Sequence, residues 1–154
     1  MNQALLLAGG IGLVAGLRSL TAPAFVSWAA YLHWINLAGT PLAFMGSPIA
    51  VGIFTFLAIV ELIADVLPKT PPRTAPMGLI ARIVTGGLSG ACIYAAAAAA
   101  PIVGAMLGII GAVIGTFAGY HIRRALVSGL KVKDIVIAIP EDMVAIVLAY
   151  CIVR

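Results

Sequence analysis

Two pairs of carboxylates interrupt long apolar runs, and they are the residues of this sequence best suited to chemistry. Glu61 and Asp65 are four residues apart and share one helix face, while Glu141 and Asp142 follow Pro140 in the last apolar run. An ionisable side chain inside a bilayer costs about 3 kcal/mol or more, so each acid needs a partner, water or a path to the interface. The pairs predict a polar site for a cation, a proton or a small solute, and the sequence indicates no cofactor and no particular metal.

Three arginines are candidate charge partners for these acids: Arg18, Arg123 and Arg124. At 1.5 Å per residue, Glu61 and Glu141 each lie roughly 10 Å from one membrane surface, so they are expected to meet at one level. The same counting places Arg18 about two thirds of the way across, away from the acids. An open alternative is that the acids only pair with arginines and lock helices together.

The composition of the chain predicts the class of fold that positions these side chains. The chain has 154 residues, of which 63% are hydrophobic and 9% charged, and its mean hydropathy is +1.18. Apolar runs of about 20 residues predict an all-α, polytopic membrane helix bundle. We expect one transmembrane domain over 1–154 with five spans, at about 3–22, 48–67, 77–99, 101–122 and 135–153.

Aromatic residues follow the first predicted span. Trp28, Tyr31 and Trp34 recur at helical spacing, which indicates an interfacial helix at headgroup depth. The alternative is that this segment is the tail of one long first helix, kinked at Pro23.

Positive residues lie around two of the four connections between predicted spans, and the other two connections have none. These residues are Lys69, Arg73, Arg82, Arg123, Arg124, Lys131 and Lys133. The positive-inside rule then predicts a cytoplasmic N-terminus and a C-terminus outside, with the first span retained because no positive leading region precedes it. Since this rule explains the net charge of +4, nucleic acid is not an expected partner.

Small residues mark close helix contacts. Glycines three or four residues apart follow one face of the fourth span, at positions 104, 108, 111, 115 and 119, and the third span has a similar face at 86, 87 and 90. Such faces predict either a central place in the bundle or a homo-oligomer contact, besides the contacts with membrane lipids. Residues 15–27 also resemble residues 118–128 when two positions are dropped, which suggests a weak inverted repeat.

Three stretches carry a resemblance to a known family: "GLRSLTAPAFVSW", "ELIADVLPKTPPRT" and "PEDMVAIVLAY". In their order along the chain they resemble the small bacterial membrane proteins grouped as DUF4126, over essentially the whole chain. The resemblance implies an integral protein of the bacterial inner membrane and no assigned activity. The motif positions carried over are Arg18, Glu61, Asp65, Glu141 and Asp142.

Three functional hypotheses remain. The first is a small transporter or channel-like protein with an acid-lined polar site, working as a homo-oligomer because five short helices enclose little volume. The second is a non-transporting scaffold or lipid-binding protein whose charges are interhelical ion pairs. The third, a lipid-modifying enzyme, has no motif of catalysis behind it.

Overall fold

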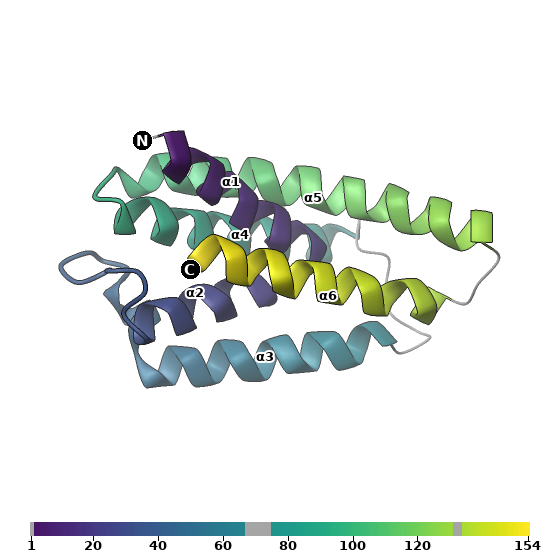
Figure 1. The fold of residues 1–154 in the computed structure, drawn as a ribbon, viewed down its shortest axis with the longest axis horizontal. Helices are drawn as coiled ribbons and strands as arrows, with labels where there is room; N and C mark the ends of the chain where they lie inside the picture. Colours follow the sequence, from purple (N-terminus) through teal and green to yellow (C-terminus); the bar gives the residue numbers. More distant parts are fainter. Residues whose placement is uncertain (1, 67–74, 131–133) are drawn as a thin grey trace.

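The computed structural model describes residues 2–66, 75–130 and 134–154. Within these ranges the chain is helical and contains no strand, which confirms the all-α bundle (Figure 1). The elements are α1 (Asn2–Leu17), α2 (Thr21–Tyr31), the 3-10 turn η1 (Ala43–Gly46), α3 (Pro48–Val66), α4 (Pro76–Ala96), α5 (Pro101–Leu130) and α6 (Asp134–Val153). Proline opens α3, α4 and α5, where its missing N–H leaves no donor unsatisfied.

Four of the five predicted spans are confirmed as single helices. These four, α3 to α6, are long and apolar enough to cross a membrane, so the protein is a multi-pass membrane protein in contact with lipid. Their bounds agree with the predicted ones except in α5, which continues to Leu130 and is 30 residues long. At 1.5 Å per residue α5 exceeds the hydrocarbon thickness, so one of its ends extends past the apolar core.

The first predicted span, 3–22, is wrong as a continuous helix. The last bond of α1 runs from the Arg18 N–H to the Val14 carbonyl, and α2 resumes with the Ala24 N–H on the Leu20 carbonyl. In an unbroken helix the ring of Pro23 would clash with the carbonyl of Ser19, four residues earlier. The chain therefore leaves the helix at residues 18–20, and we call this interruption the break.

The chain reverses direction at the break, as Figure 1 shows. A Cβ built on Gly10 would lie 3.1 Å from Ile152 Cδ1, so the middle of α1 lies beside the end of α6. On the other side of the break, α2 returns along α3, with the Trp28 indole donating to Thr55 Oγ1 at 3.0 Å. Helices α1 and α2 thus form a re-entrant pair that enters and leaves at one end.

This reversal bears on where the two termini lie within the bundle. An odd number of crossings would separate the two ends of the chain, whereas four crossings and a re-entrant pair leave both at the same end (Figure 1). The C-terminal ends of α3 and α5, which precede the connections expected to be cytoplasmic, lie at the opposite end of the bundle (Figure 1). The charged residues of these connections, Lys69, Arg73, Lys131 and Lys133, fall outside the described residues.

The expected interfacial helix is also corrected. Seven of the eleven residues of α2 are buried, so it packs inside the bundle instead of lying on the membrane surface. Only its far end and the following loop expose aromatic rings, at Trp28, Tyr31 and Trp34. Trp34 meets Tyr150 edge to face, with 6.0 Å between ring centroids, as expected of an aromatic belt at a membrane surface.

The glycines of α5 pack it between two neighbouring helices. A methyl group on Gly108 would overlap the Gly86 carbonyl of α4, and one on Gly115 would overlap the Leu13 carbonyl of α1. In lipid, such close backbone contact provides the attraction that the hydrophobic effect cannot supply. The predicted central place of α5 is therefore observed, and these faces are used within one chain, so they are not available as the oligomer contact that we had expected.

The inverted repeat finds no support in the local structure. Residues 15–27 contain the break between α1 and α2, whereas residues 118–128 lie within the continuous helix α5. The two segments therefore share residue types without sharing a backbone conformation.

Candidate functional site: a broken helix and an ion-pair chain

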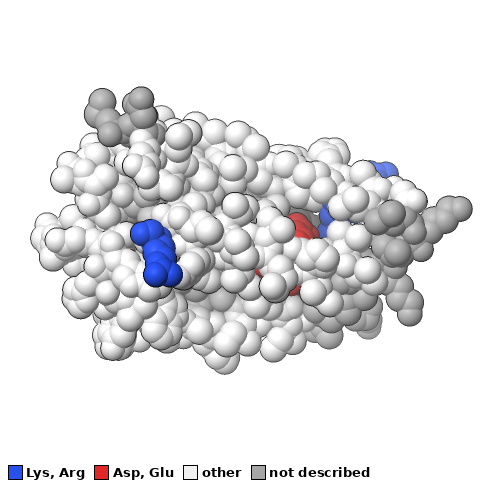
Figure 2. Space-filling view, viewed as in Figure 1, with Lys and Arg blue, Asp and Glu red and all other residues white. Residues whose placement is uncertain are grey.

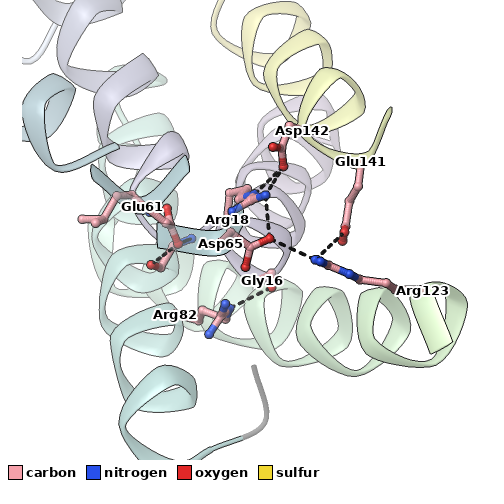
Figure 3. A network of polar contacts seen from close by, with 10 residues as sticks. Gly16, Arg18, Glu61, Asp65, Arg82, Arg123, Glu141 and Asp142 are labelled. Carbon is pink, nitrogen blue, oxygen red and sulfur yellow. Dashed lines mark hydrogen bonds and ion pairs between the residues drawn. The ribbon is translucent and has the colours of Figure 1, made fainter. Parts of the chain in front are cut away.

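Five charged side chains from four elements meet beside the break (Figure 3). They alternate in sign and we call them the ion-pair chain: Arg18, Asp65, Arg123, Glu141 and Asp142. Arg18 stands at the end of α1, Asp65 on α3, Arg123 on α5 and the two remaining acids on α6. The ion-pair chain therefore links the end of α1 with α3, α5 and α6, and has no member on α4.

Arg18 is the most buried member, with 2% of its side chain exposed. Its Nη2 lies 2.9 Å from Asp65 Oδ2, and its Nε donates to Asp142 Oδ1 at 2.6 Å. A guanidinium presents several donors in one plane, which lets it serve acids on two helices at once. The expectation that Arg18 lies far from the acids was wrong, because α1 enters from the end opposite to the one assumed.

Arg123 forms the other half of the ion-pair chain. Its Nη1 donates to Asp65 Oδ2 at 2.9 Å and lies 3.5 Å from Glu141 Oε2. One oxygen of Asp65 is thus shared by two arginines. The adjacent acids Glu141 and Asp142 meet different arginines, since neighbouring helix residues point about 100° apart.

Glu61 lies outside the ion-pair chain. Its Oε1 accepts from the Ser19 N–H at 2.8 Å and the Ser19 hydroxyl at 2.7 Å, and its Oε2 accepts from the Leu20 N–H at 2.8 Å. These N–H groups are freed at the start of α2, so Glu61 acts as a helix cap supplied by another helix. The expected meeting of Glu61 with Glu141 is not observed: Arg18 and Asp65 stand between them (Figure 3).

Arg82 was missed as a site residue, because it was counted among the charges of a connection. It lies in α4 with 8% of its surface exposed, and its Nε donates to the Gly16 carbonyl at 3.1 Å. Thr116 Oγ1 lies 3.3 Å from the same carbonyl. The signal was present in the sequence, since residue 82 falls inside the predicted span 77–99. We call Glu61 and Arg82 the break clamp.

Other candidates are not brought to the site. Arg124 is exposed and makes no ion pair or hydrogen bond within the described ranges, so it is not a partner of the described acids. His33 and His121 are exposed as well. Among the described residues no group of three or more His, Cys, Asp or Glu side chains could hold a metal ion.

The acids of the ion-pair chain are not completely sealed. Asp65, Glu141 and Asp142 keep 12%, 13% and 16% of their side chains exposed. Figure 2 shows acidic atoms set below the surrounding surface with basic atoms beside them, while other basic atoms lie elsewhere on the same face. Polar groups are thus reachable from outside the bundle at a depth where the surrounding surface is apolar.

These features define a polytopic α-helical membrane protein whose first apolar segment is broken beside a network of opposite charges. The family described as "Domain of unknown function (DUF4126)" matches residues 5–154, and the chain belongs to this family. The chain has no significant match among curated proteins or solved structures.

Proposed function

We propose that this protein is a small transporter or channel-like protein in which the ion-pair chain handles a cation, a proton or a small solute. The observation that carries the proposal is the shared Asp65 oxygen, held between Arg18 and Arg123 at the break. Two cations compete there for one acceptor, so protonation or an incoming cation can redistribute the partners without unfolding a helix.

The break itself supports this proposal. Non-helical backbone at membrane depth is tolerated only inside protein or beside a polar cavity, and discontinuous helices are where many transporters place their sites. Here the break lies next to acids that keep some exposure, from 12% to 16%. The proposed site residues are therefore Asp65, Glu141 and Asp142, with Arg18 and Arg123 as their internal counter-ions.

The test is flux of protons and of a panel of small cations and solutes in proteoliposomes. We expect flux through the parent protein that is lost in Glu141→Gln and Asp142→Asn, because each removes a charge from the ion-pair chain. Arg124→Gln is the matched control, because it removes an exposed charge from α5 next to Arg123. Absence of flux in the parent across the panel would contradict the proposal.

A second candidate is a membrane scaffold or lipid-binding protein in which the same charges are interhelical locks. The observation that favours it is that each acid of the ion-pair chain contacts an arginine, and that Glu61 accepts hydrogen bonds on both oxygens. A parent without flux whose helix contacts loosen in the same variants would support this candidate.

We further propose an orientation in the bacterial inner membrane. If the connections at 67–74 and 131–133 are cytoplasmic, as their lysines and arginines predict, both termini lie outside. Labelling of single cysteines near each terminus by a membrane-impermeant reagent tests this, and labelling of only one terminus would contradict it.

The proposed homo-oligomer would have to use outward surfaces, such as that of α3, and cross-linking in native membranes tests it.

A further inference from the structure

One of the helix hydrogen bonds lost at the break is replaced by two side-chain contacts. In a continuous helix the Leu20 N–H would donate to the Gly16 carbonyl, four residues earlier. Here the Leu20 N–H donates to Glu61 Oε2 at 2.8 Å, and the Gly16 carbonyl accepts from Arg82 Nε at 3.1 Å. One acid and one base thus take over the two halves of the missing bond.

The signs of the two charges match the helix ends that they meet. Glu61 lies at the N-terminus of α2, where freed N–H groups carry partial positive charge, and Arg82 lies at the C-terminus of α1, where carbonyls carry partial negative charge. Arg82 is also anchored on its own helix, with Nη1 donating to the Gly78 carbonyl at 2.9 Å. The guanidinium therefore ties the end of α1 to α4.

We infer that Glu61 and Arg82 are positioning residues that together keep the break formed and so place Arg18 in the ion-pair chain. Arg18 lies two residues after Gly16 and directly before Ser19, so the break clamp fixes the backbone on both sides of it. Both clamp residues bind backbone groups that flank Arg18, so they act on the position of Arg18 through that backbone. The inference rests on the proposed function only where it concerns flux.

The test is amide hydrogen exchange of the full-length protein in detergent micelles, read at Ser19 and Leu20. Glu61→Gln removes one acceptor oxygen, and we expect exchange at both amides to rise about tenfold or more. Arg82→Gln is the decisive variant, because Arg82 touches neither amide, and we expect it to raise exchange at the same two positions. Arg82→Lys restores a charge and a donor and should recover most of the protection.

Controls separate a local effect from general loosening. Arg124→Gln, at an exposed position, should leave exchange at Ser19 and Leu20 unchanged, and the buried amides of Cys92 and Ala112 report global opening in every variant. Unchanged exchange at Ser19 and Leu20 in Arg82→Gln overturns the inference. If that variant does not fold, Arg82→Met, which keeps an unbranched side chain and removes the donors, is judged by the same criterion.

Flux links the break clamp to the site. With the parent active, Arg82→Gln should raise the KM for the transported species while Arg82→Lys restores it, because a displaced Arg18 changes the site and not the number of folded molecules. A parent without flux contradicts the proposed function, yet the exchange experiment still decides whether the clamp holds the break.

Discussion

Glu61 and Asp65 are one helical turn apart on α3, yet they meet different kinds of partner. Glu61 accepts hydrogen bonds from two backbone N–H groups and one hydroxyl, whereas Asp65 holds two arginine side chains. Backbone groups at a helix end cannot move away without unfolding the turn, while arginine side chains can exchange partners by rotating. The comparison separates a region that builds the site from a region that can change its state.

The largest expected effect comes from removing the shared carboxylate. Asp65→Asn leaves Arg18 and Arg123 facing a neutral amide, and breaking a buried ion pair by removing one partner costs about 3–5 kcal/mol. We expect the free energy of unfolding in detergent micelles, measured by denaturant titration, to fall by that amount. A loss no larger than that of Glu61→Gln would erase the distinction between the two acids.

Removing one arginine should have a smaller effect. Arg123→Gln deletes charged contacts to Asp65 and Glu141 but leaves Arg18 to serve Asp65, and we expect a loss of about 2–3 kcal/mol. Arg124→Gln, one residue away and exposed, should change the free energy of unfolding by less than about 0.5 kcal/mol. Equal losses in the two variants would show that the contacts of Arg123 in the ion-pair chain add no stability beyond that of an exposed charge.

Weakening the hydrogen bonds of Glu61 at the start of α2 should lower the free energy of unfolding by less than the substitutions of Asp65 and Arg123. Glu61→Gln keeps shape and one acceptor oxygen, but places an amide donor near backbone donors, so we expect a loss of about 1–2 kcal/mol. The same unfolding titration measures it. A loss comparable to that of Asp65→Asn would mean that the break clamp contributes as much to the stability of this region as the ion-pair chain does.

The smallest effect is expected at the C-terminal end of α2, which lies away from the ion-pair chain and the break clamp. Trp28→Phe removes the exposed hydrogen bond to Thr55 and keeps an aromatic ring at the membrane surface, so we expect a loss of about 0.5 kcal/mol. A larger loss would show that α2 depends on this anchor as much as on the break clamp.

Much of the fold was predictable because membrane helices are specified locally. Continuous apolar length predicts α3 to α6 in the correct places, and glycine spacing predicts that α5 is central, since close packing needs small residues on one face. The identity of most site residues followed from the cost of charge in lipid, which makes Arg18, Asp65 and Glu141 conspicuous in the sequence. Those inferences need no knowledge of which helices are neighbours.

The break was the point at which local reasoning failed. An apolar run of 20 residues is compatible with one crossing, and Pro23 alone is compatible with a kink as well as with a reversal. The reversal becomes favourable only when Glu61 and Arg82, from two other helices, satisfy the backbone groups that it frees. Counting crossings before knowing these contacts placed Arg18 away from the acids that it contacts.

The sequence by itself determined that this protein is a multi-pass helical membrane protein with costly charges within its apolar segments, because hydrophobic length and charge are properties of single segments. The tertiary structure alone decided which charge meets which. Ion pairing and helix capping depend on distances of a few ångströms between side chains and backbone from segments far apart in the chain. For that reason Glu61 became a cap, Arg82 a clamp and Asp65 the shared centre of the ion-pair chain, although the residue types alone did not distinguish their roles.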